Sequence, residues 1–156
     1  MRSWSSKGIG GFMEELPALL VVLVALSVFI AGAANAYYAY VDHRESLSRR
    51  ERCQAFVGQV LSEPGLTAES RNALFDRSKL EAMSNEEFTA RFPSARAGFE
   101  YSVEITAPDA AYTAGFGYSP VEAQTKVVIE APCNILDEEG IVWPGLLRLT
   151  AWGFGS

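Results

Sequence analysis

"LPALLVVLVALSVFIAGAANAYYAYV", residues 16–41, contains no charged side chain and sets the organisation of the whole chain. As an α-helix it would rise about 1.5 Å per residue and so exceed the roughly 30 Å hydrocarbon core of a bilayer. The apolar region of a secretory signal peptide is shorter, at about 7–15 residues. The sequence therefore predicts a transmembrane helix that is retained in the mature protein.

The chain around this stretch is short and acidic. Its 156 residues are enough for one modest domain plus the anchor. The net charge of −6 falls mainly after the anchor, and no basic stripe is present. We therefore expect no nucleic-acid partner.

The apolar stretch is predicted to continue into one long helix over residues 12–61. The segment DHRESLSRRER (42–52) is polar on every face but has no Gly or Pro to end a helix. Beyond it, five residues recur at helical spacing and therefore share one face: Cys53, Phe56, Val57, Val60 and Leu61. That face needs a packing partner, and SEPG (62–65) ends the helix.

The remainder predicts short helices followed by strands. Residues 66–97 hold apolar positions at helical spacing, and Ser84 with Glu87 fits a capping box. In FEYSVEIT (99–106) apolar and polar residues alternate, as in a half-buried strand. The rest reads as a Gly/Pro/Ala-rich loop (107–120), a strand (125–135), the turn LDEEG (136–140) and one or two strands in IVWPGLLRLTAW (141–152). The expected fold class is α+β, a long N-terminal helix packed on a small antiparallel sheet.

A short basic lead, MRSWSSKG (1–8), precedes the apolar stretch and ends in Lys7-Gly8. The arrangement resembles the N-terminus of type IV prepilins and of similar archaeal filament precursors with a class III signal peptide. In that family a dedicated peptidase cuts after such a glycine on the cytoplasmic face. The resemblance implies cleavage within five residues: Lys7, Gly8, Ile9, Gly10 and Gly11.

Two acids, Glu14 and Glu15, stand between the lead and the apolar stretch. Many members of the family carry a glutamate five residues after the cut. Cleavage after Gly10 makes Glu15 the fifth residue, whereas cleavage after Gly8 makes Glu14 the sixth, so the bond stays open. Side by side, such helices would bring the new ammonium of one chain near a carboxylate of another in a low dielectric. The alternative is two acids favoured by the dipole at a helix N-terminus.

Small residues recur along the apolar stretch. Four of them follow one another every seven positions, and a fifth forms a small-xxx-small pair with Gly32: Ala18, Ala25, Gly32, Ala39 and Ala36. Such a stripe lets helices approach closely in lipid or in a filament core. The alternative is that alanine is simply common in membrane helices.

The order of fragments after the long helix is similar to that of small euryarchaeal pilin-like surface proteins. These fragments are LSEPGL, SKLEAMS, FEYSVEI and VWPGLLRLTAW. The resemblance implies a minor or accessory subunit that is not an enzyme, inserted in the membrane and assembled with other pilin subunits into a surface filament or complex. It further implies a leader (1–8), a transmembrane half (9–41) and an outer half (42–62) of the long helix, and a globular part (63–156) outside the cytoplasm.

The two cysteines, Cys53 and Cys133, lie on the predicted packed helix face and in a predicted strand. A disulfide between them would close a loop of about 80 residues, worth on the order of 4 kcal/mol in the chain-entropy model. We expect this bridge, because disulfides persist outside the cytoplasm. The alternative is two separate buried thiols.

Nothing in the sequence predicts an enzyme. The one histidine, His43, follows the membrane stretch in a polar segment. No catalytic triad pattern, phosphate-binding glycine loop or zinc spacing is present, so we expect no cofactor and no metal. The acidic turn Asp137-Glu138-Glu139 is interpreted as a solvated hairpin tip rather than a calcium site.

One pattern opposes the expected orientation. Arg2 and Lys7 precede the apolar stretch, while four arginines follow it closely: Arg44, Arg49, Arg50 and Arg52. Read literally, the positive-inside rule would put the C-terminal part in the cytoplasm. The prepilin-like lead and the cysteine pair favour the outside. The second hypothesis is an uncleaved single-pass membrane protein whose outer part is a binding module.

Overall fold

The computed structural model describes residues 7–69, 71–119 and 125–155, with side chains in the first helix described from residue 16 onward. The first helix, α1 (Lys7–Leu61), contributes to two compact units. The first unit is Met1–Glu45 and the second, called the head below, is Ser46–Ser156. Helix α1 begins earlier than the sequence predicts and ends where SEPG predicts, at Leu61.

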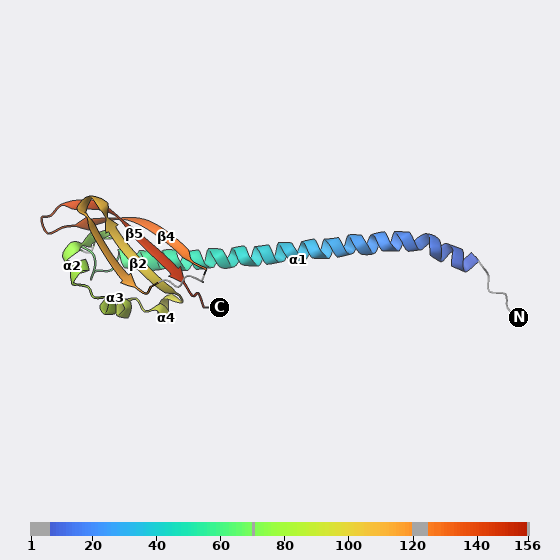
Figure 1. The fold of residues 1–156 in the computed structure, drawn as a ribbon, viewed down its shortest axis with the longest axis horizontal. Coiled ribbons are helices and arrows are strands. Elements are labelled where there is room, and N and C mark those ends of the chain that lie inside the picture. Colours follow the sequence, from blue (N-terminus) through green and yellow to red (C-terminus); the bar gives the residue numbers. More distant parts are fainter. Residues whose placement is uncertain (1–6, 70, 120–124, 156) are drawn as a thin grey trace. The chain divides into compact units, whose positions relative to one another are not determined.

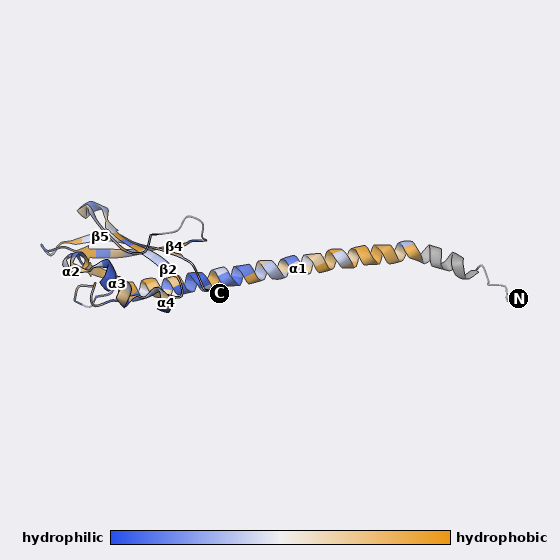
Figure 2. Ribbon diagram, turned by 60° about the horizontal axis from the view of Figure 1, so that its bottom comes forward, coloured by the Kyte–Doolittle hydropathy of each residue, from blue (hydrophilic) through white to orange (hydrophobic). Residues whose placement is uncertain are grey.

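Within the first unit, α1 carries the apolar stretch on its surface. Figure 2 shows this part of the helix mainly in the colours of hydrophobic residues. The large side chains along it are exposed, Phe29 to 72% and Val21 to 68%. The helix is long and apolar enough to cross a membrane, and none of that stretch is buried inside the structure. The structure therefore agrees with a membrane-spanning helix.

The head is an α+β unit built on one five-stranded sheet (Figure 1). Its elements in chain order are β1 (Leu74–Asp76), α2 (Arg77–Ala82), α3 (Asn85–Arg91), α4 (Ser94–Ala97), β2 (Glu100–Ala107), η1 (Pro108–Ala110), β3 (Tyr112–Gly117), β4 (Val127–Leu136) and β5 (Val142–Trp152). The strand order is β1-β4-β5-β2-β3. All neighbours are antiparallel except β1 and β4, which are parallel. The predicted fold class is confirmed, with the sheet mixed rather than purely antiparallel.

Three local predictions need correction. The segment 66–97 contains the short strand β1 as well as helices, and its pairing with β4 makes the sheet mixed. The predicted loop 107–120 contains η1 and β3, because Tyr112–Gly117 pairs with β2 despite its Gly and Ala content. The segment 141–152 forms one long strand, β5, since Pro144 and Gly145 stay in register with β4.

The core of the head lies between the sheet and residues 53–60 of α1. Cys53, Phe56, Val57 and Val60 are at most 5% exposed, which confirms the predicted packed face. The ring centroid of Phe56 lies 4.6 Å from that of Tyr101, 5.5 Å from Phe99 and 5.7 Å from Phe92. These residues come from α1, from the end of α3 and from the start of β2. Phe56 therefore joins the helix to the sheet and to the helical segment between them.

Polar contacts fix the elements that cover the sheet. The Tyr101 hydroxyl donates a buried hydrogen bond to the backbone carbonyl of Phe92. Ser84 and Glu87 form the predicted capping box at the start of α3. The Asn85 side chain accepts a hydrogen bond from the backbone N–H of Gly117 at 2.7 Å and donates one to its carbonyl at 3.2 Å. These bonds tie α3 to the end of β3.

Gly117 is the position at which a side chain is least tolerated in the head. Its φ of +97° is unfavourable for other residues, and a Cβ atom there would lie 2.4 Å from the backbone oxygen of Tyr101. The lack of a side chain at Gly117 therefore lets its backbone lie close to β2.

We predict that Phe56→Ala destabilises the head by about 3–5 kcal/mol, the usual cost of truncating a buried phenylalanine. The matched control is Gln54→Ala, because Gln54 is exposed two residues away on the same helix and such changes stay within roughly 0.5 kcal/mol. Denaturant unfolding of the full chain in detergent, followed by tryptophan fluorescence, measures both. A loss below about 1 kcal/mol for Phe56→Ala would contradict the role given to this ring.

Candidate membrane helix and packing surface

The candidate functional surface is the apolar part of α1, residues 16–41. Large aliphatic and aromatic side chains are exposed along it, including Leu19, Val24 and Ile30 at 59–62%. Soluble proteins rarely expose contiguous apolar surfaces beyond a few hundred Å². In a helix, the backbone hydrogen bonds are satisfied internally, so lipid or other helices can cover these side chains. This surface therefore requires an apolar environment that the described chain does not supply.

The predicted small-residue stripe lies along one line of this helix. Seven residues turn an α-helix by about 700°, which leaves neighbours in the stripe only about 20° apart. A Cβ atom added at Gly32 would meet nothing within 4 Å. The absence of a side chain at Gly32 is therefore not required by packing within the chain. It leaves room for a neighbouring helix.

Asn35 is a polar residue of this surface that the sequence reading missed. Its side chain is exposed within the uncharged stretch, and no hydrogen bond to it is found in the described part of the chain. It follows Gly32 by three positions and precedes Ala39 by four, so it lies beside the stripe. An amide in lipid gains most from a partner on another helix. The sequence does mark this residue, because Asn35 is the one amide side chain in residues 16–41.

The structure brings the cleavage residues Lys7–Gly11 and the acids Glu14 and Glu15 into the backbone of α1. Their side chains, like residues 1–6, lie outside the part that the structure describes. Leader cleavage and pairing of the acids with an ammonium therefore stay predictions.

The prediction of a disulfide between Cys53 and Cys133 is wrong. Cys53 and Cys133 are both free and buried, at 0% and 4% exposure. The sulfur of Cys133 occupies the space above Gly145, where an added Cβ atom would lie 3.2 Å from Sγ. Each thiol is thus a packing element of the head core. Burial raises the pKa of each from 9.0 to about 11.

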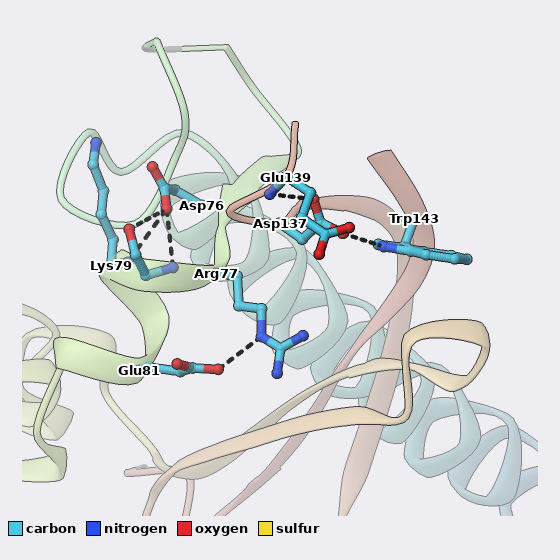
Figure 3. Close-up of polar contacts among 8 residues, drawn as sticks. Asp76, Arg77, Lys79, Glu81, Asp137, Glu139 and Trp143 are labelled. Atoms are coloured by element: carbon cyan, nitrogen blue, oxygen red, sulfur yellow. Dashed lines mark hydrogen bonds and ion pairs between the residues drawn. The ribbon is translucent and has the colours of Figure 1, made fainter. Parts of the chain in front are cut away.

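The acidic turn Asp137-Glu138-Glu139 is a folded hairpin tip (Figure 3). The Asp137 carboxylate accepts hydrogen bonds from the indole N–H of Trp143 at 2.8 Å and from the backbone N–H groups of Ile141 and Glu139. The indole contact is the main cause of a lowered Asp137 pKa. Among the described residues, no group of three or more His, Cys, Asp or Glu side chains is placed to hold a metal ion.

A second polar cluster lies beside this turn. Arg77 pairs with Glu81 at 2.7 Å and stacks its guanidinium over the Tyr112 ring at 5.1 Å. Figure 3 shows Arg77 between Glu81 and Asp137. Asp76, the last residue of β1, caps the first turn of α2 by accepting hydrogen bonds from the backbone N–H groups of Ser78 and Lys79. These contacts fasten α2 to the sheet and contain no arrangement typical of a catalytic centre.

Comparison with known proteins finds no family model, no curated protein and no solved structure that matches the chain. The fold and the helix surface together define an α+β protein in which, among the described residues, one N-terminal helix is able to span a membrane.

We predict that Gly32→Ile weakens self-association of the full chain in a bilayer without lowering the stability of the head. The physical reason is that a Cβ at Gly32 meets nothing within the chain but would hold a neighbouring helix away. The matched control is Ala34→Ile, because two residues turn the helix by about 200° and place that change on the opposite face. Energy transfer between labelled copies in vesicles measures association. Equal effects of the two substitutions would refute the stripe.

We predict that the head loses stability as the pH rises from about 9 to about 11. Because the folded thiols have raised pKa values, their stabilisation is fully present below the unfolded pKa. It is lost as the pH passes the folded pKa, by up to about 2–3 kcal/mol per thiol. Denaturant unfolding at each pH measures the effect, and the Cys53→Ala/Cys133→Ala variant should have a shallower slope. Alkylation of both cysteines in denaturant without reductant checks that they are free; labelling only after reduction would contradict the structure.

Proposed function

We propose that this protein is a non-enzymatic type IV pilin-like subunit, minor or accessory, that assembles through its N-terminal helix. The observation that carries the proposal concerns α1. Its last turns, including Cys53, Phe56 and Val60, form part of the head core. Its uncharged residues 16–41 are exposed and have no partner in the described chain. A helix used in this way anchors a folded head to an apolar assembly.

The proposed sequence of events begins in the membrane. The apolar part of α1 inserts into the bilayer, and a prepilin peptidase removes the leader at Gly8 or Gly10. In assembly the helix exchanges contact with lipid for contact with other helices. The small residues around Gly32 and the amide of Asn35 would form that contact. The head stays folded throughout, because its core does not include residues 16–41.

In this proposal, Glu14 and Glu15 set the alignment of neighbouring helices along their axes. Cleavage creates a new α-ammonium group a few residues before them. A carboxylate from a neighbouring helix can pair with this ammonium, and the pair is strongest where water is excluded. A buried charge left without its partner costs about 3–5 kcal/mol, so helices in the wrong register are disfavoured.

The alternative is an uncleaved single-pass membrane protein whose head is a binding module. The arginines that follow the apolar stretch favour this alternative through the positive-inside rule. The two functions differ in the state of the N-terminus. That difference makes the processing of the chain the decisive measurement.

We predict that the mature protein begins at Ile9 or at Gly11. Intact mass and N-terminal peptide sequencing of the protein purified from its own host measure this. Gly8→Leu should block the first cut and Gly10→Leu the second, while Gly58→Leu, which has open space around it, should leave processing unchanged. A chain that begins at Met1 or Arg2 would refute the pilin-like function and support the uncleaved membrane protein.

We predict that neutralising one of the two acids lowers assembly severalfold while the other substitution has little effect. Glu15→Gln should be the damaging change if the cut follows Gly10, and Glu14→Gln if it follows Gly8. Both variants keep the shape of the side chain, so membrane insertion should be unchanged. Insertion therefore serves as the internal control. The ratio of filament-bound to membrane-bound protein is the readout. Normal assembly of the Glu14→Gln/Glu15→Gln double variant would show that no ammonium–carboxylate pair is needed.

A further inference from the structure

The head carries a groove lined by arginines that the proposed function does not use. It has a volume of about 510 Å³ and lies among the last turns of α1, the end of α3 and α4. Three arginines, Arg52, Arg91 and Arg96, line it together with aromatic rings that include Phe92 and Phe99. Arginine guanidinium groups beside an apolar floor bind carboxylates well, because the pairing is bidentate and partly shielded from water.

Most of the positive charge in this groove is not neutralised within the chain. Arg91 lies 3.3 Å from the carboxylate of Glu63. Arg52 and Arg96 are exposed, and no ion pair reaches either of them among residues 7–69, 71–119 and 125–155. The groove therefore has two cationic groups available for an anionic partner.

The same head presents a matching anionic element. The turn between β4 and β5 exposes Glu138 and Glu139. Neither side chain forms an ion pair within the described part of the head, although the charge of Glu138 contributes to the raised pKa of Arg77. Asp137 fixes the shape of this turn through its bonds to Trp143 and to the backbone. The two exposed carboxylates are thus carried on a preorganised hairpin tip, which lowers the entropy lost on binding.

The turn cannot fill the groove of its own chain. It directly precedes β5, whereas α4 lies at the other end of that strand, next to Glu100, which pairs with Trp152. The strand has 11 residues, and at about 3.3 Å per residue these ends are roughly 35 Å apart. Figure 1 shows α4 and the β4–β5 turn at different ends of the sheet.

We propose that the β4–β5 turn of one copy docks in the arginine groove of the next copy. Glu138 and Glu139 pair with Arg52 and Arg96 across this contact. Because the two surfaces on each head are different, the contact is heterologous and extends from copy to copy instead of closing into a dimer. The inference deepens the proposed function by naming the contact between heads, and it rests on assembly of copies through α1.

Cysteine trapping in vesicles tests the contact with the full chain. One tagged copy carries Ala55→Cys in the groove lining, and a second copy with a different tag carries Ile141→Cys, an exposed position that directly follows the turn. Mild oxidation should link the two tags, since the natural cysteines are buried. The matched control replaces Ala55→Cys by Glu51→Cys, an exposed position of α1 that does not line the groove. The control should give roughly tenfold less linked product. Equal linkage at both positions would overturn the proposal.

Charge reversal separates a specific contact from random collision. Arg52→Glu/Arg96→Glu in the groove copy should lower the linkage by roughly tenfold. Adding Glu138→Lys/Glu139→Lys to the turn copy should restore a large part of it, because both pairs are then opposite in charge again. The reversal Arg50→Glu outside the groove should have little effect. Failure of the groove reversal to lower linkage, or of the second reversal to restore it, would overturn the proposal.

Anionic lipid is the competing occupant, and the same experiment detects it. Linkage should be equal in vesicles with neutral and with anionic headgroups at 0.15 M salt. Loss of linkage only with anionic lipid would assign the groove to headgroups and overturn the contact between heads. The result is independent of processing. Absence of linkage, when protein from the host begins at Ile9 or Gly11, would refute this inference alone. Linkage in vesicles, when protein from the host begins at Met1 or Arg2, would refute the proposed function alone.

Discussion

The burial of one helix face against the head sheet is the interaction on which the rest of the structure depends. Phe56 brings α1, the end of α3 and the start of β2 into one aromatic cluster. The Tyr101 hydroxyl lies inside this cluster, and its donor is satisfied by the carbonyl of Phe92. A buried hydroxyl without that acceptor would cost about 1–3 kcal/mol. The position of Phe92 therefore decides both the packing of Phe56 and the orientation of the β2 tyrosine.

This arrangement gives one helix two different environments. One face of residues 53–60 of α1 is buried in the head core, so its apolar side chains find their packing partners within the chain. Residues 16–41 have the same backbone hydrogen bonding but lack any cover among the described residues. Apolar side chains left in water cost about 25 cal/mol for each Å² exposed. Lipid removes that cost, and neighbouring helices remove it equally well, so the helix can pass from one environment to the other without unfolding the head.

Several elements of the fold could be predicted because their signals are local. The end of α1, the capping box at Ser84 and the alternation in β2 each depend on residues close in sequence. Strand β1 could not be predicted, since three residues carry no periodicity and their partner β4 lies some 60 positions later in the chain. The glycines of β3 favour a loop prediction, although in the structure Gly117 serves close approach to β2 and Gly115 has open space around it. Sequence separation of the cysteines likewise says nothing about whether two sulfur atoms meet.

The arginines after the apolar stretch illustrate how structure changes the weight of a sequence signal. Counted as charges alone, Arg44, Arg49, Arg50 and Arg52 favour a cytoplasmic head. In the folded head, the Arg49 guanidinium lies over the ring of Phe154 at 5.6 Å, and Arg52 lines the groove beside α3 and α4. An arginine held over an aromatic ring contributes packing as well as charge. Arg49 therefore has a packing role in the head in addition to its charge. The free thiols remove the cysteine pair as an argument for an outer head, so the prepilin-like lead is the remaining sequence argument for that orientation.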